Sequence, residues 1–187
     1  MKGRLQIGSV ISVMSVMSIV AMALAASSAV VRAAESLRII PAVHNDRVLV
    51  SFEVADAYAD DVRDAISSGL RTTFSYDVEL RMIVRGWVDR TIATAVIGTS
   101  DQYDNLTRRH RLVRTIDGRV AESLVTEDEA VVKQWLTTLS RLPLCETSRL
   151  DPNRDYYVRI SAHVPHRTSL LGWTTAVIGL TKFTFVP

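Results

Sequence analysis

The sequence has few of the residues on which covalent cross-links and phosphate-binding loops depend. It contains one cysteine, Cys145, so no disulfide can form within the chain. Because a free cysteine usually packs as a small hydrophobe, we expect Cys145 to be buried and inert, with an intermolecular bond as the alternative. The 8 glycines form no phosphate-cradling loop, and neither a Gly-x-Ser-x-Gly elbow nor a His-Glu-x-x-His motif is present. No cofactor is therefore expected.

An excess of charge of one sign is also lacking. Three of the 22 basic residues, Lys2, Arg4 and Arg32, lie near the N-terminus, which leaves 19 basic residues against 20 acidic ones from residue 34 onward. A nearly neutral body gives no electrostatic reason to bind nucleic acid. We therefore expect no nucleic-acid partner.

Residues 1–34 have the pattern of an export leader. Lys2 and Arg4 precede the apolar, uncharged run Ile7–Val31, and small residues permit a cut after Ala33. This pattern predicts a Sec-type signal peptide. An uncleaved signal anchor is the alternative, because the run is long enough to span a bilayer, which takes about 20 helical residues. Residues 35–187 are expected to form a single periplasmic or otherwise extracytoplasmic domain, tethered to the inner membrane if the leader is retained.

Alternation of apolar and polar residues dominates the body of the chain. Across Thr73–Arg85 the apolar residues fall on even positions and the polar ones on odd positions, and only Ile83 breaks the pattern. A period of two is typical of a strand that buries one face in an antiparallel sheet. The same reasoning predicts strands at Leu37–Val43, Arg47–Val54, Ile92–Thr99, Leu106–Ile116, Arg119–Leu124, Tyr156–Val164 and Lys182–Val186. His44-Asn45-Asp46 and Asp117-Gly118 predict tight hairpin turns.

Two segments change to a helical period. Asp60–Ser68 predicts a short helix that ends at Gly69. Thr126-Glu127-Asp128-Glu129 predicts a capping box, followed by an amphipathic helix over Glu127–Leu139. Leu142–Leu150 is expected to be extended, although its proline disfavours a central strand. The expected fold class is mainly β with one or two helices: an antiparallel β-sandwich-like sheet with a helix packed on one face or end.

Three of these segments together carry a family resemblance. They are Gly69–Leu80, with a Gly-Leu…Phe…Tyr…Val-Glu-Leu strand entry; Tyr103–Leu112, similar to Tyr-Asp-x-Leu-Thr-Arg-x-Tyr-x-Leu; and Tyr156–Val164. His110 stands where the second pattern usually has tyrosine. The chain resembles, over about Leu37 to Pro187, an exported bacterial family known as a domain of unknown function, number 4390 in that series. The resemblance implies an envelope-located β-rich domain, with relatives near sensor kinase genes that point to envelope sensing or upkeep. It implies no catalytic residues.

Binding residues are expected in a basic cluster and in one apolar stretch, namely Arg108, Arg109, Arg111, Arg114 and Trp173. The arginines could hold a small anion or a lipid headgroup. Alternatively, the arginines lie on an edge strand or a solvent-exposed strand, where their charges deter association with other sheets, or they pair across strands with Asp77 and Glu79. Leu170–Ile178, which contains the tryptophan, is a contact surface for a partner or a membrane if the domain leaves it uncovered, and core otherwise.

Catalytic and metal chemistry find little support. His163 and His166 are the one close histidine pair, but residues three apart on a strand point to opposite faces, so no metal site is expected. Four acidic residues could form a carboxylate pair for general acid–base catalysis, namely Asp101, Asp104, Asp117 and Glu122. Each of them is expected at a turn or hairpin, where such a residue has a conformational role.

The functional expectation is a non-enzymatic β-sandwich binding module of the cell envelope, with a protein or lipid partner. A small-anion sensor that uses the Arg108–Arg114 cluster is the alternative, and a hydrolase is the least favoured hypothesis. Contact with a membrane is expected only through an uncleaved leader or the Leu170–Ile178 stretch.

Overall fold

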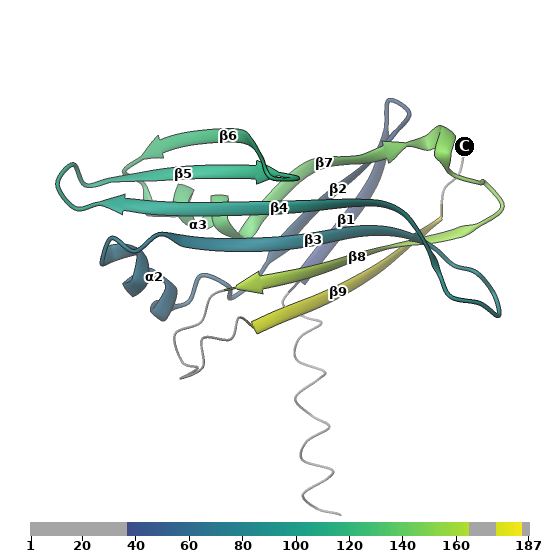
Figure 1. Ribbon diagram of the computed structural model, residues 1–187, viewed down its shortest axis with the longest axis horizontal. Coiled ribbons are helices and arrows are strands. Elements are labelled where there is room, and N and C mark those ends of the chain that lie inside the picture. Colours follow the sequence, from purple (N-terminus) through teal and green to yellow (C-terminus); the bar gives the residue numbers. More distant parts are fainter. Residues whose placement is uncertain (1–36, 165–174, 185–187) are drawn as a thin grey trace, which may run out of the picture.

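The computed structural model describes residues 37–164 and 175–184, which form two antiparallel sheets and two α-helices (Figure 1). The strands of the described residues are β1 (Leu37–His44), β2 (Arg47–Val54), β3 (Thr72–Met82), β4 (Arg90–Asp104), β5 (Arg109–Ile116), β6 (Arg119–Thr126), β7 (Thr138–Glu146), β8 (Asp155–Val164) and β9 (Thr175–Thr184). The helices are α2 (Asp60–Ser67) and α3 (Glu129–Thr137), with a short 3-10 turn, η3 (Thr147–Arg149). The prediction of a mainly β, sandwich-like fold is confirmed.

The two sheets differ in size. The larger has the order β6-β5-β4-β3-β8-β9, and the smaller has the order β1-β2-β7. In Figure 1 the long strands β3 and β4 run across the molecule, with both helices at the end where β4 turns into β5. At the other end, the β3–β4 hairpin lies beside the chain that leads from η3 into β8. The large sheet therefore has two well-separated ends, and each is closed by different loops.

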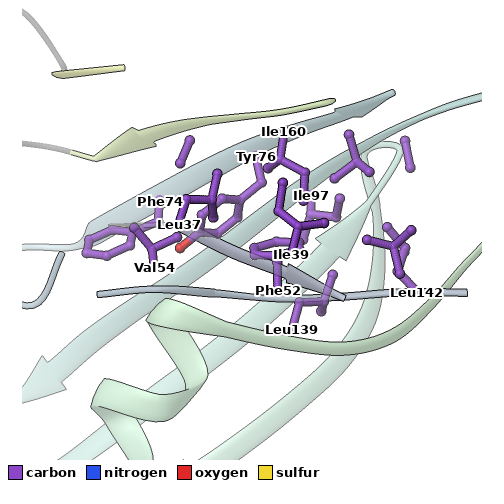
Figure 2. Close-up of a cluster of buried hydrophobic side chains, with 14 of the residues drawn as sticks. Leu37, Ile39, Phe52, Val54, Phe74, Tyr76, Ile97, Leu139, Leu142 and Ile160 are labelled. Atoms are coloured by element: carbon purple, nitrogen blue, oxygen red, sulfur yellow. The ribbon is translucent and has the colours of Figure 1, made fainter. Parts of the chain in front are cut away.

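The core lies between the inner faces of the two sheets. Figure 2 shows Phe74, Tyr76 and Ile160 of the large sheet meeting side chains of the small sheet. Phe52 packs on Tyr76 with ring centroids 4.9 Å apart, and the Tyr76 hydroxyl donates to the Leu136 carbonyl. Because buried phenol groups need a hydrogen-bond partner, this contact lets a tyrosine occupy the centre of the core and ties α3 to it.

Both predicted hairpin turns are present. Asn45 and Asp46 have φ of 49° and 57°, and Asp117 and Gly118 have φ of 50° and 75°. Two successive left-handed residues form the turn that matches the twist of a two-residue hairpin, and Asn, Asp and Gly adopt this conformation at low cost. The β1–β2 and β5–β6 pairings follow directly from these turns.

Several predicted boundaries are wrong: β3 ends at Met82 rather than at Arg85, and η3 interrupts the extended segment predicted over Leu142–Leu150. Strand β4 continues to Asp104 instead of ending near Thr99, and β5 begins at Arg109 instead of at Leu106. The final strand starts at Thr175, earlier than predicted. The polar residues at the end of β4 read as loop although its ladder with β5 continues to Asp104, whereas the apolar Leu106 read as strand although it lies in the β4–β5 turn.

The predicted capping box at the start of α3 is also wrong. Asp128 is the N-cap, and its carboxylate accepts from the Ala130 amide at 2.8 Å. The Thr126 hydroxyl accepts from the Asp128 amide at 3.0 Å instead. The helix ends at Thr137 because β7 begins at the next residue, so Leu139 belongs to a strand rather than to the helix.

The sequence-based predictions about Cys145, about the proline in the segment after α3 and about membrane-spanning helices can also be compared with the structure. Cys145, on β7, is half-buried against the core, and burial raises the pKa of its thiol, which keeps it protonated. Pro143 lies on the same strand, which among the described strands pairs with β2 alone and is thus an edge strand, where proline is tolerated. No helix within residues 37–164 and 175–184 is both long and apolar enough to cross a membrane.

Candidate functional site

A cavity of about 290 Å³ opens at the helical end of the large sheet, where α2, the β4–β5 turn and the β6–α3 connection meet. We call it the His110 pocket. It combines aromatic rings with charged groups of both signs, and its lining residues are Tyr58, Arg63, Ile66, Ser67, Tyr103, Arg108, His110, Glu127 and Glu129. Its volume is near the lower end of the range for small-molecule sites, about 300–1,000 Å³.

A buried contact between a histidine and an aspartate supports the wall of the pocket. His110 Nδ1 lies 2.8 Å from Asp101 Oδ2, and the Asp101 side chain is fully buried. Tyr103 lies directly opposite His110 in the β4–β5 ladder, and their rings stack with centroids 4.6 Å apart. The imidazole is therefore held by a carboxylate on one side and an aromatic ring on another, which fixes its orientation in the pocket wall.

Burial dominates the electrostatics of Asp101. It raises the pKa of this carboxyl above the ordinary 3.8, while the hydrogen bond and charge of His110 lower it in part. The second carboxylate oxygen, Oδ1, is buried without a hydrogen-bond partner among the described residues. A buried carboxyl with an unsatisfied oxygen costs folding free energy, which the contact with His110 offsets only in part.

Tyr58 and Arg63 form the opposite wall with Glu129. Arg63 Nε lies 2.8 Å from Glu129 Oε1, and the Tyr58 hydroxyl donates to the same oxygen at 3.5 Å. Burial, followed by the charge of Glu129, raises the pKa of Tyr58 to about 12. The phenol thus stays protonated at neutral pH and remains a donor on the pocket wall.

The β4–β5 turn holds an exposed leucine and one arginine that lines the pocket. The Asp104 carboxylate accepts from the Leu106 and Thr107 amides at 2.9 and 3.3 Å, and these contacts lower its pKa. The turn is thereby ordered, yet Leu106 is 95% exposed. Arg108, with φ of 57°, lines the pocket and forms no hydrogen bond or ion pair with any other described side chain.

The structure separates the arginines of the predicted basic cluster. Arg109 pairs with Glu127 at 3.0 Å, and Arg114 pairs with Glu122 at 2.8 Å. Arg111 instead lines a different, polar surface hollow together with Asp104. Of these four arginines, Arg108 alone lines the His110 pocket, so the cluster is not gathered around one described cavity. The alternative pairing with Asp77 and Glu79 does not form, because β4 lies between β5 and β3.

The contacts of Arg114 tie β5 to the end of α3 and the start of β7. Its guanidinium lies 4.2 Å from the Trp135 ring centroid and donates to the Trp135 and Thr138 carbonyls at 3.2 and 3.4 Å. These carbonyls belong to the last turn of α3 and the start of β7, where helical partners run out. Trp173, the remaining predicted binding residue, lies outside the described residues, as does His166.

Sequence reasoning named Asp101 and His110 but did not connect them. Asp101 was expected at a turn, whereas it lies inside β4 and is buried. Residues 100–102 are all polar, so no alternation in the sequence marked this end of the strand, and only the folded ladder shows Asp101 on the inner face with Thr99. The other acidic candidates have separate partners. Asp117, in the β5–β6 turn, accepts from the Val96 amide of β4 at 2.9 Å, and Glu122 pairs with Arg114.

Metal ligation has no geometric basis in the part of the chain that the structure describes. No group of three or more histidine, cysteine, aspartate or glutamate side chains converges within these residues. His163 instead lies 3.6 Å from Asp77 on the exposed face of the large sheet.

The fold and its pocket define a small two-layer antiparallel β protein with a ligand-sized cavity at one end. The chain belongs to the family described as domain of unknown function DUF4390, whose model matches residues 32–169. The matched region contains every strand from β1 to β8 and the whole His110 pocket. No curated protein and no solved structure matches this chain.

Proposed function

We propose that this chain is a non-enzymatic binding module of the cell envelope, and that it docks a protein partner at the His110 pocket. The observation that carries the proposal is the ordered β4–β5 turn, which holds a nearly fully exposed Leu106 two residues before an unpartnered Arg108, and Arg108 lines the cavity. Arginine and tyrosine are among the residue types that dominate binding at protein interfaces, and Leu106 adds exposed apolar area beside them in the sequence.

The charges of the pocket favour an acidic group on the partner. Arg63 pairs with Glu129, and Glu127 pairs with Arg109, which does not line the pocket, so Arg108 is the lining arginine without a counter-ion. A guanidinium beside aromatic rings can hold a carboxylate through two hydrogen bonds. We therefore expect the partner to place a glutamate, an aspartate or a C-terminal carboxylate at Arg108.

Binding is favoured over hydrolysis because the histidine has no nucleophile to activate. Ser67 is the serine that lines the pocket, and its Oγ donates to the Asp64 carbonyl at 3.0 Å, while the Tyr58 hydroxyl donates to Glu129. The one side-chain partner of His110 is Asp101. A general base needs its nucleophile within hydrogen-bond reach, and no described hydroxyl is in that position.

The test is capture from envelope membranes with matched variants. Solubilised envelopes would be passed over the immobilised wild-type chain, Leu106→Asp, Arg108→Ala and the control Trp87→Ala. Trp87 is 82% exposed on the β3–β4 hairpin, so it is an equally solvent-facing apolar residue at the far end of the sheet. A partner bound by wild type and Trp87→Ala, but weakened about tenfold or more by each pocket variant, is the expected result.

The same experiment can contradict the proposal. Loss of the partner in Trp87→Ala with retention in Leu106→Asp would place the interface at the opposite end. Equal retention by all variants would remove the His110 pocket from consideration as the docking site.

A further inference from the structure

Three arginines converge at the other end of the large sheet. Arg90, Arg149 and Arg154 line a cavity of about 330 Å³ with Met82, Ile92 and Asp151 among its other walls. Arg90 is the first residue of β4, Arg149 the last of η3, and Arg154 directly precedes β8. We call this cavity the arginine pocket. It lies about 30 Å from Asp101, since the intervening strand length is some ten residues at about 3.3 Å each.

The frame of the arginine pocket is ordered by hydrogen bonds. Arg149 Nη2 donates to the Ile92 carbonyl at 3.0 Å, which links η3 to β4. The Asp151 amide donates to the buried Tyr156 hydroxyl at 2.7 Å, and the Asp151 carboxylate accepts from the Asn153 amide at 2.9 Å. The loop between η3 and β8 is thus pinned to the strands beneath it, and the guanidinium groups start from fixed backbone positions.

The charges in this pocket are not balanced. Asp151 is the one acidic residue that lines it, and its Oδ2 lies 3.8 Å from Arg154 Nε. Arg90 forms no hydrogen bond or ion pair with any other described side chain, and the lining residues together carry a net charge of +2. Like charges gathered around a hollow raise the local concentration of anions, because the surrounding low-dielectric walls focus their field.

We propose that the arginine pocket binds a phosphate group. A phosphate monoester carries about −1.5 to −2 charges at neutral pH and three acceptor oxygens, which matches three guanidinium donors with a net charge of +2. Met82 and Ile92 provide apolar wall for an organic substituent. The phosphate can come from a soluble phosphate monoester or from a phospholipid headgroup, and the site is independent of the docking function proposed for the His110 pocket.

The test is a titration of the ¹⁵N-labelled chain with inorganic phosphate and glycerol 3-phosphate, followed by NMR. The amide resonances of residues 90–92 and 149–154 are expected to shift. Arg90→Ala should weaken binding about tenfold, the cost of one charge-assisted hydrogen-bonding group, and Arg90→Lys should weaken it less. Since Arg90 has no partner to lose, the variant is expected to keep its melting temperature, which a thermal scan without ligand would check.

The matched control is Arg119→Ala, which removes the same charge from an exposed, unpaired arginine at the start of β6. It should leave phosphate binding unchanged. An equal loss in Arg119→Ala and Arg90→Ala would mean unspecific attraction and would overturn the proposal, as would a wild-type chain whose pocket amides do not shift.

Vesicles separate the two sources of phosphate. Sedimentation with phosphatidylcholine vesicles that contain phosphatidic acid, in parallel with pure phosphatidylcholine vesicles, would be compared for wild type and Arg90→Ala. Arg90-dependent binding to the anionic vesicles identifies a headgroup site. Binding of the soluble phosphates without vesicle binding identifies a soluble ligand.

Discussion

Asp101 and His110 are diagonal neighbours on β4 and β5, and their side chains meet at 2.8 Å below the mouth of a pocket. The ladder pairs Asp101 with Leu112 and Tyr103 with His110, so the acid lies two residues from the direct partner of the imidazole on the same face. Diagonal pairs of this kind are within reach of long or aromatic side chains. The contact therefore depends on β4 continuing as a strand to Asp104.

Loss of the imidazole should destabilise the protein strongly. His110→Phe keeps a ring against Tyr103 but leaves the fully buried Asp101 carboxylate without its partner. Breaking a buried pair in this way costs about 3–5 kcal/mol of unfolding free energy. Chemical denaturation at neutral pH would measure the loss, and the double variant Asp101→Asn with His110→Phe should recover most of it.

An exposed histidine–aspartate pair supplies the control. His163 lies 3.6 Å from Asp77, and both side chains are at least one-third exposed. His163→Phe should therefore cost no more than about 1 kcal/mol. Equal costs at His110 and His163, or no recovery in the double variant, would show that burial of Asp101 is not what makes its pair matter.

The pH dependence of stability should reveal the same buried acid. Burial raises the pKa of Asp101 above 3.8, so the folded protein holds this proton where the unfolded chain has lost it. The unfolding free energy contributed by Asp101 is therefore greatest at low pH and falls as pH rises from about 4 through the raised pKa. Denaturant melts of wild type and Asp101→Asn between about pH 4 and 7 isolate the effect, and the relative stability of the variant should increase with pH. A constant difference would contradict this assignment.

Arg114 should tolerate no conservative replacement. Its planar guanidinium bonds Glu122 and the Trp135 and Thr138 carbonyls while it stacks on the Trp135 ring. Lysine has a single ammonium and cannot reproduce this fork, so Arg114→Lys should cost about 2–3 kcal/mol of unfolding free energy. The exposed Arg111→Lys is the control, with a change within about 0.5 kcal/mol. Similar small effects at both positions would indicate that Arg114 does not hold the end of α3.

The fold was largely predictable because its signals are local. Alternation over Thr73–Arg85 and the two left-handed hairpin turns follow from single residues and their neighbours, and they specify β3 and two strand pairings. The start of α3 was less predictable because Thr126 and Asp128 both have capping chemistry, and only tertiary context decides which one caps. The order β6-β5-β4-β3-β8-β9 depends on long-range contacts that no local pattern encodes.

The candidate sites were less predictable, for the same reason. A run of arginines in the sequence suggested one basic patch. In the structure, Arg108 lies in the β4–β5 turn and Arg111 and Arg114 lie on β5, and each of the three has different neighbours. Conversely, Arg90 and Arg149 lie far apart in the chain and meet only because β3 and β8 are neighbours in the sheet. Charge density in sequence is thus a poor guide to charge density in space when the segment is a strand.

The packing of β1 against β9 gives a last test of how the two sheets fit together. At Gly179 an added Cβ would lie 2.6 Å from Leu37 Cδ2 and 3.0 Å from Ile39 Cδ1, closer than side chains approach one another. Gly179→Ala should therefore cost about 1–3 kcal/mol of unfolding free energy, as overpacking typically does. Leu37→Ala removes the nearer group, so the double variant should be more stable than the sum of the two single losses predicts. Ile178→Ala, a neighbouring side chain that is 46% exposed, should cost less than Gly179→Ala. Strict additivity of the Gly179 and Leu37 variants in denaturant melts would mean that β1 does not rest on β9 at this glycine.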